Sequence, residues 1–243
     1  MKALLLKEIR TFLSSLIGYV VVAVFLLLTG LFLWIFDGDF NILQSGFASI
    51  EPLFYISPWV LMFLIPAVTM RSFAEEKRTG TIELLITKPI TDTQIIGAKY
   101  LAGFLLVVIA IVPTLVYYFT VYSLGDPAGN IDSGGTWGSY IGLLLLAAGY
   151  VAIGIFSSSI TSNQIVSFLV SAMLCFFMYT GFSSIASFEL LGAADTVILN
   201  LGMQAHYNSL SRGLIDSRDV VYFLALIFTF LLLTKTVLNA RKW

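Results

Sequence analysis

Six apolar stretches without a charged residue constrain this chain more than any other feature of its sequence. They lie at 16–36, 53–70, 100–122, 139–159, 165–187 and 220–234. The first has 21 residues. At about 1.5 Å per residue, a helix of this length covers roughly 30 Å, which is the thickness of the hydrocarbon core of a bilayer. We therefore predict an all-α membrane protein with six transmembrane helices.

The composition excludes a single soluble domain. Hydrophobic residues make up 58% of the 243 residues and charged residues only 11%, whereas soluble domains carry about 25% charge. The net charge of −1 indicates no nucleic-acid partner. Cys175 and His206 are each the only residue of their type, and a metal site needs three or four ligands. We expect no metal and no cofactor in this chain, and we expect both residues to serve in packing or in a loop.

The fourth and fifth stretches are separated only by the polar string 157–164. A single helix across both would be far too long for one crossing, so we predict two helices joined by a tight turn. Gly138 and Gly142 form a GxxxG pair in the fourth stretch, which permits close approach of another helix. We favour packing within one chain over a dimer contact for this pair.

Basic residues indicate how the chain is oriented. With the N-terminus inside, eleven of the thirteen Lys and Arg residues fall in inner segments, and only Arg212 and Arg218 fall outside. Lys and Arg are enriched in cytoplasmic loops, so we predict a multi-pass protein of the cell inner membrane with both termini in the cytoplasm. Residues 1–243 then form one transmembrane domain.

Residues 1–15 are predicted to form an amphipathic helix on the membrane surface. On a helical wheel the apolar face collects Leu5, Ile9, Phe12, Leu13 and Leu16. The polar face collects Lys7, Glu8, Arg10, Thr11, Ser14 and Ser15. A basic amphipathic helix of this kind lies along the boundary between headgroups and acyl chains.

The cytoplasmic segment 71–99 carries the densest run of charge. Thr91 and Gln94 form a capping box that starts the third span. Pro89 ends a short helix predicted at 81–87, which would lie across the membrane plane. The stretch 75–80 is expected to face the cytoplasm, with Gly80 at a corner that needs a positive φ or a close backbone approach.

This segment resembles the coupling loop of ABC-2 type transporter permeases, which has the form E-x-x-x-G-T-[IL]-E-x-L-[IL]-x-x-P between the second and third helices. The matching residues are Glu76, Gly80, Thr81, Ile82, Glu83, Leu85, Ile86 and Pro89. The resemblance also covers the six spans and the surface helix. A second match, at 207–223, resembles the outer segment of gliding-motility-associated permeases, a branch that is similar to copper-nitrous-oxide-reductase-type permeases.

The resemblance implies a permease subunit of an ATP-driven ABC transporter rather than an enzyme. A separate cytosolic ATPase would bind ATP and Mg and would dock on the coupling segment, and this chain has no phosphate-loop motif. The implied docking residues are Glu75, Glu76, Lys77, Arg78, Thr79, Gly80, Thr81, Glu83 and Leu84. A second permease, identical or a sister chain, is also implied. The process served would be export, gliding motility or secretion.

Two other functions are considered. A non-transporting membrane scaffold of a motility or secretion complex would have the same spans. An intramembrane protease of the CAAX type would need an EExxxR motif, but Gly80 stands where that arginine is required and His206 is predicted outside. The long outer loop 188–219, just before the sixth helix, is expected to dip back into the outer leaflet, and the sequence does not indicate whether it contacts a substrate or a partner.

Overall fold

The computed structural model describes residues 2–81, 90–188 and 192–240, and within them the chain is helical without a strand. Helix α1 (Lys2–Ser14) precedes the spans, and helices α3 (Ile42–Ser45), α12 (Ala193–Leu199) and α13 (Met203–Leu210) lie between them. The membrane-crossing helices are α2 (Leu16–Gly30), α4 (Glu51–Thr69), α7 (Asp92–Ile111), α8 (Leu115–Leu124), α9 (Ser133–Ile160), α10 (Gln164–Phe176), α11 (Phe182–Ala186) and α14 (Ser217–Asn239).

Several of these helices join end to end, so the described residues contain six helical units that are long and apolar enough to cross a membrane. A π-helical turn at Leu31–Ile35 extends α2, and a 3-10 turn at Val112–Thr114 joins α7 to α8. A second π-helical turn, at Phe177–Gly181, joins α10 to α11. The six predicted spans are confirmed.

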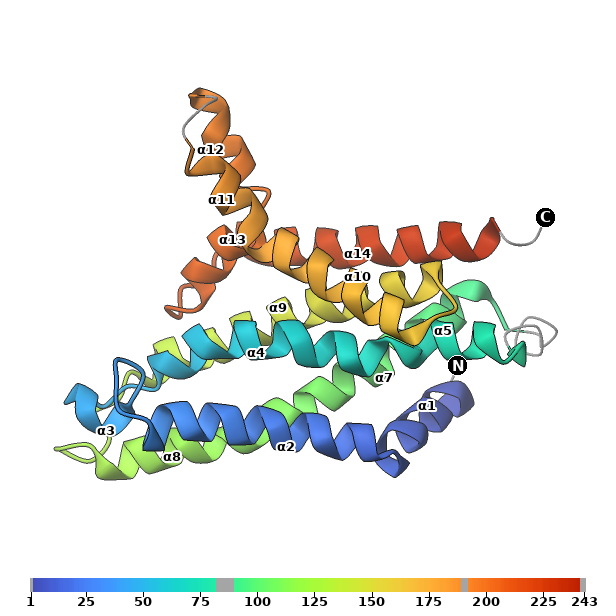
Figure 1. Ribbon diagram of the computed structural model, residues 1–243. Helices are drawn as coiled ribbons and strands as arrows, with labels where there is room; N and C mark the ends of the chain where they lie inside the picture. The colour runs from blue at the N-terminus through green and yellow to red at the C-terminus, as the bar shows by residue number, and fades with distance from the viewer. Residues whose placement is uncertain (1, 82–89, 189–191, 241–243) are drawn as a thin grey trace.

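Helix α9 forms the centre of the bundle. It packs against α4, α7, α10, α13 and α14, and it is the most buried of the six spans (Figure 1). Both α1 and the last residues of α14 lie at one end of the bundle, whereas α3 and the last turn of α8 lie at the other (Figure 1). We refer to these as the α1 end and the α3 end.

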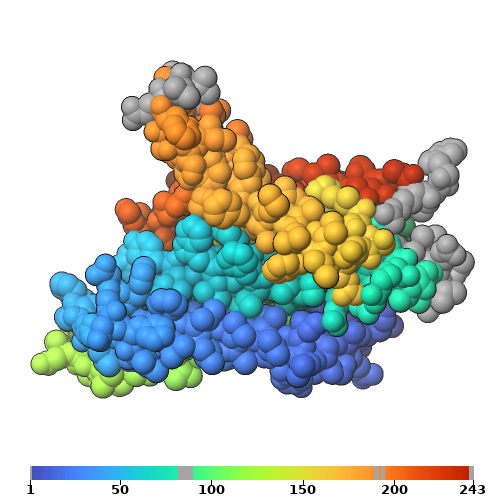
Figure 2. All heavy atoms as spheres, in the orientation of Figure 1, coloured from blue at the N-terminus to red at the C-terminus, as the bar shows by residue number. Residues whose placement is uncertain are grey.

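Helices α11 and α12 project sideways from the bundle. Figure 2 shows this projection standing clear of the rest of the molecule. The described residues of the predicted outer loop 188–219 are divided between this projection and the bundle. Its part at Met203–Leu210 is a helix, α13, which packs back on α9.

The predicted tight turn between the fourth and fifth spans is present, but it is shorter than the polar string suggested. Helix α9 runs to Ile160 and α10 begins at Gln164, with the Asn163 side chain accepting from the backbone amides of Ile165 and Val166. Residues 157–159 are serines inside α9 and are buried. A serine in a helix can satisfy its hydroxyl on the backbone of the preceding turn, so a run of serines does not by itself end a helix.

Glycines on α9 allow α13 and the turn after it to approach closely. A Cβ at Gly138 would lie 2.6 Å from the carbonyl oxygen of Gly213, and one at Gly142 would lie 2.5 Å from the Cβ of Leu210. The predicted use of this pair for packing within one chain is confirmed. Gly213 itself has φ +79°, and a side chain there would overlap the backbone of Gly135.

Replacing Gly213 with alanine is expected to lower the free energy of unfolding by about 1–3 kcal/mol, because a fixed backbone cannot move aside for the methyl group. The measurement is the thermal midpoint of the purified protein in detergent. The matched control is Gly46→Ala, since Gly46 has φ +70° but open space around it. Equal shifts for the two variants would mean that left-handed strain, and not the contact with α9, accounts for the loss.

A helix, α1, is present at the position predicted for the surface helix, but its inward face differs from the predicted one. The buried residues of α1 are Leu4 and Glu8, and α1 packs against α7. Glu8 was assigned to the solvent face, and this was wrong. An acidic side chain is buried only when a partner of opposite charge is present, and a helical wheel contains no information about that partner.

Candidate functional site

Helix α5 (Arg71–Arg78) continues the second span beyond the end of α4, so the predicted coupling segment begins as helix and not as loop. The backbone at the start of α5 is held by one side chain from α9. Ser158 Oγ accepts hydrogen bonds from the backbone amides of Phe73 and Ala74, at 2.9 and 3.1 Å. It also donates to the carbonyl oxygen of Met70 at 3.0 Å. This serine therefore fixes the junction of α4 and α5 to the central helix.

Four charged side chains form a network at the α1 end of the bundle, which we call the charge cluster: Lys7, Glu8, Glu76 and Lys99. The Lys99 ammonium lies 2.8 Å from Glu76 Oε1 and 3.2 Å from Glu8 Oε1. Its side chain is 1% exposed and lies over the ring of Phe73, with 5.1 Å between Nζ and the ring centroid. A buried ammonium needs such partners, because the cost of removing it from water is several kcal/mol.

Lys7 completes the charge cluster from its exposed side. Its ammonium lies 3.3 Å from Glu8 Oε1 and 3.5 Å from Glu76 Oε1. Partial burial by itself would lower the pKa of Lys7, but attraction by the two carboxylates outweighs burial and raises that pKa above its usual value of 10.5. Because the pKa is raised on folding, this contribution to stability is present at neutral pH. It is lost only as the pH rises through the raised pKa.

The cluster joins three parts of the chain that are far apart in the sequence. Glu8 comes from α1, Glu76 from α5 and Lys99 from α7. The capping box predicted at Thr91 and Gln94 is present and starts α7, so it sets the register that places Lys99 toward α1 and α5. Two cations and two carboxylates balance one another, and the surface helix is thereby tied to the segment after the second span.

The structure brings the predicted docking residues to two different environments. Glu76 was expected to face the cytoplasm, and this was wrong: its side chain is 12% exposed and its Oε1 atom is paired with Lys99 and Lys7. Glu75 is half-buried. Lys77 is also half-buried and donates to the carbonyl oxygen of Ser159 at the end of α9. The contacts of Glu76 and Lys77 hold α5 in place.

The remaining docking residues form an exposed corner after α5. Arg78, Thr79, Gly80 and Thr81 are all exposed. Gly80 has φ +70°, as predicted, and the hydroxyls of Thr79 and Thr81 lie 3.0 Å apart. Residues 82–89 lie outside the described part of the chain. They include Glu83, Leu84, Pro89 and nearly all of the predicted helix 81–87.

Reasoning from the sequence missed three residues of this site. Ser158 was treated as part of a connector. Lys99 was noted only as fitting the start of the third span, although a lysine inside an apolar helix needs a partner of opposite charge. Glu8 carried the clearest signal, because it is the only acidic residue before Asp37. An acid in a basic surface helix can indicate an internal ion pair.

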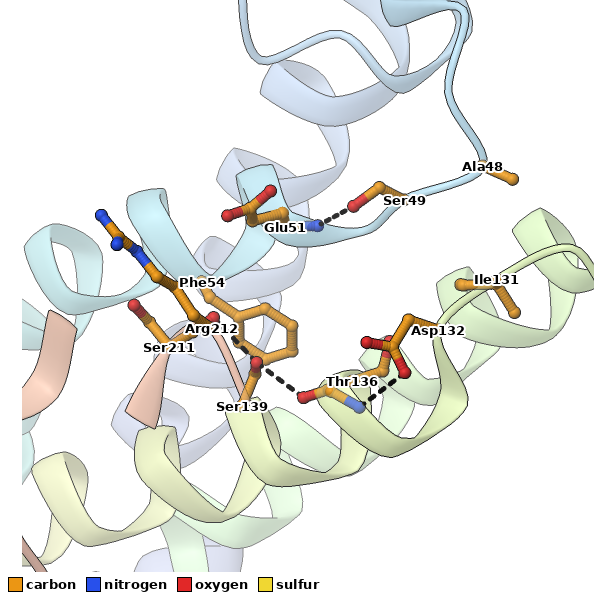
Figure 3. A pocket seen from close by; sticks show the side chains of 11 residues that line it. Ala48, Ser49, Glu51, Phe54, Ile131, Asp132, Thr136, Ser139, Ser211 and Arg212 are labelled. Carbon is orange, nitrogen blue, oxygen red and sulfur yellow. Dashed lines mark hydrogen bonds between the residues drawn. The ribbon is translucent and has the colours of Figure 1, made fainter. Parts of the chain in front are cut away.

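A cavity of about 340 Å³ lies at the α3 end between α4, α9 and the turn after α13 (Figure 3). Glu51, Asp132 and Arg212 line it. The polar groups labelled in Figure 3 largely serve the fold: Asp132 caps α9 through the amide of Gly135, and Ser139 donates to the carbonyl oxygen of Ser211. The α1 end, which combines a buried charge cluster with the predicted coupling segment, is therefore the stronger candidate for a functional site.

Six membrane-crossing helices and a surface helix define the chain as a multi-pass α-helical membrane protein. Residues 37–199, about two thirds of the chain, match the model of the ABC-2 family transporter proteins. The chain therefore belongs to this family, whose members are the membrane-embedded permease components of ABC transporters. No curated protein sequence matches the chain.

Proposed function

We propose that this chain is the permease subunit of an ATP-driven ABC transporter and that a separate cytosolic ATPase docks on the segment 71–99. One observation carries the proposal. Helix α5 is fixed by Ser158 and by the charge cluster, and it ends at an exposed corner with a positively charged side chain, Arg78. A partner bound at such a corner can transmit displacement to the spans, because the element that carries the corner is tied to three of them.

The orientation proposed is that of a protein of the cell inner membrane with both termini in the cytoplasm. The asymmetry of Lys and Arg supports it. The arrangement of the bundle is consistent with it, since α1, α5 and the last turn of α14 share one end (Figure 1). The α1 end would then be the face that meets the ATPase, and the α3 end would face the periplasm.

Two further parts of the proposal rest on the family and on resemblance. A second permease, identical or a sister chain, would complete the transporter. The similarity of 207–223 to gliding-motility-associated permeases supports a role in motility or secretion. A non-transporting scaffold of such a complex is the alternative, and docking of an ATPase on the coupling segment would distinguish the transporter from it.

Reversing the charge at the exposed corner tests the docking. We expect Arg78→Glu to lower the amount of co-purified ATPase about tenfold, equal to about 1.4 kcal/mol of binding free energy. Gly80→Val should also lower it, since valine strongly disfavours the left-handed conformation found there. The measurement is the ATPase recovered with each variant, normalised to folded permease. Reversal of Glu76 is unsuitable, because a lysine there would disrupt the charge cluster.

The matched control is Arg212→Glu, an equal change of charge at an exposed arginine of the α3 end. It should leave the recovered ATPase unchanged. If Arg78→Glu and Gly80→Val retain as much ATPase as this control, then the corner is an ordinary solvated connection and the proposed docking is wrong.

A further inference from the structure

The turn between α12 and α13 is attached to α14 by a histidine. The Nδ1 atom of His206, on α13, lies 2.7 Å from Oδ1 of Asp219 in the first turn of α14. Its Nε2 atom lies 2.9 Å from the carbonyl oxygen of Asn200, the C-cap residue of α12. We call these three residues the histidine bridge. The bridge lies at the base of the projection formed by α11 and α12 (Figure 1).

Both oxygens that face the imidazole ring are hydrogen-bond acceptors. A carbonyl oxygen can only accept, and so can an ionised carboxylate. A neutral imidazole has one N–H group, so it can donate to one of these oxygens and must turn a lone pair toward the other. The histidine bridge is complete only with one further proton, held between Nδ1 of His206 and Oδ1 of Asp219. The geometry of the bridge therefore corresponds to its protonated state.

A tyrosine makes a neighbouring attachment that does not depend on this proton. The ring of Tyr222 stacks on the ring of His206, with 4.0 Å between the ring centroids and 20° between the planes. The hydroxyl of Tyr222 donates to the carbonyl oxygen of Leu201 at 2.7 Å. A phenol keeps its proton between about pH 5 and 8, the range in which histidine ordinarily changes charge. Loss of the proton would therefore weaken one of two adjacent attachments and leave the other intact.

The charged group that faces the histidine is Asp219. Within the part of the chain that the structure describes, it is the only ion-pair partner of His206. Helix α9 and the π-helical turn at Phe177–Gly181 also pack on α13, and neither contains a charged residue. The titratable groups of α9, of this turn and of α13 itself are otherwise tyrosines: Tyr140, Tyr150, Tyr179 and Tyr207. Arg218 on α14 is exposed and Asp195 on α12 is half-buried, and neither makes an ion pair with the histidine.

We infer that the histidine bridge is a pH-sensitive switch that controls the attachment of the projection to the bundle. With the proton, Asn200 is held to α14 through His206, and α12 is fixed at its base. Without the proton, a lone pair of the ring faces an oxygen in place of one of the two hydrogen bonds, so α12 and the turn at 200–202 become more mobile. The inference does not depend on the proposed docking of an ATPase.

Hydrogen exchange in the unaltered protein is the first test. The full chain in nanodiscs is compared at about pH 5.5 and about pH 8.5, and each exchange rate is divided by the intrinsic rate at that pH. Histidine is the side chain that ordinarily changes charge in this interval, and His206 is the only histidine of the chain. Peptides that cover 196–203 should be about tenfold less protected at the higher pH, the effect of one lost hydrogen bond to a charged group. Protection at the centre of α9 should not change.

The proton itself can be followed on the same residue. Because the chain has one histidine, labelling its histidine with nitrogen-15 gives magnetic resonance signals from a single ring. Both ring nitrogens should be in hydrogen bonds at the pH at which 196–203 are protected. The loss of protection should follow the same titration as the signals of the ring.

Two variants separate the proton-dependent attachment from the other one. His206→Gln should abolish the pH dependence and leave 196–203 weakly protected at both pH values, because glutamine does not titrate. Tyr222→Phe is the matched control, since it removes the neighbouring hydrogen bond to Leu201 and keeps the histidine bridge. It should lower the protection at both pH values and preserve the ratio of about tenfold between them.

Three results would overturn the inference. The first is equal protection of 196–203 at the two pH values in the unaltered protein, which needs no variant to fold. The second is a pH dependence in His206→Gln that equals that of the unaltered protein. The third is a spectrum in which the ring of His206 has lost its proton while 196–203 keep their protection.

Discussion

Replacing Lys99 with methionine is expected to lower the free energy of unfolding by about 3–5 kcal/mol, the effect of removing one member of a buried ion pair. Methionine has nearly the volume of lysine, so the packing of α7 would change little. The loss arises because Glu8 and Glu76 would then face one another with only the half-exposed Lys7 between them. The measurement is the thermal midpoint, together with the fraction of protein that elutes as a single species from size exclusion.

A double variant separates the charge effect from the packing effect. Lys99→Met combined with Glu8→Gln leaves Lys7 and Glu76 as a balanced pair, so it should be more stable than Lys99→Met alone. This non-additivity is the signature of side chains in one network. Arg78→Met, at an exposed position, is the control for loss of a positive charge. Equal stability of Lys99→Met and Arg78→Met would show that the charge cluster contributes nothing.

Ser158→Ala is expected to have the second-largest effect, a loss of about 2–4 kcal/mol. The substitution leaves the amides of Phe73 and Ala74 buried without an acceptor, at about 1–3 kcal/mol for each buried donor. The loss should be localised, and hydrogen exchange at residues 70–78 should become faster while the centre of α9 stays protected. Peptide-resolved exchange in detergent or nanodiscs measures both regions at once.

The neighbouring Ser157→Ala is the matched control. Ser157 is equally buried, but its hydroxyl donates only to the carbonyl oxygen of Ile153 within the same helix. Removing this hydroxyl leaves no backbone amide without an acceptor, so the rate of hydrogen exchange at α5 should not change. If both variants increase exchange at α5 equally, then α5 is held by packing alone and the hydrogen bonds of Ser158 are incidental.

Features with a local cause could be predicted from the sequence. The six spans follow from the length of the apolar stretches, and the start of α7 follows from the capping box at Thr91 and Gln94. The left-handed corner at Gly80 and the close packing at Gly138 and Gly142 follow from the absence of a Cβ. Each of these features depends on residues that are close together in the sequence, so a local sequence pattern contains the information needed to predict it.

Features with a distant cause could not be predicted. Glu8 and Lys99 are 91 residues apart, and Ser158 lies 85 residues after Phe73. Nothing near Glu8 distinguishes an acid that points into the bundle from one that points into water, so the helical wheel placed it with the polar residues. Glu76 was expected to face the cytoplasm and was assigned to the docking surface because its segment resembles a coupling loop. Its partner comes from a helix that the pattern around residue 76 does not include.

The two attachments of α5 have a mechanical consequence. One attachment, through Ser158 and Ser159, leads to the last turn of α9, and the other, through Glu76, leads to α7 and α1. A force applied at the corner after Arg78 is therefore divided between the central helix α9 and the N-terminal helix α1. Neither helix can move alone without breaking buried polar contacts, so the second, third and fourth spans should shift together as one rigid block at the α1 end.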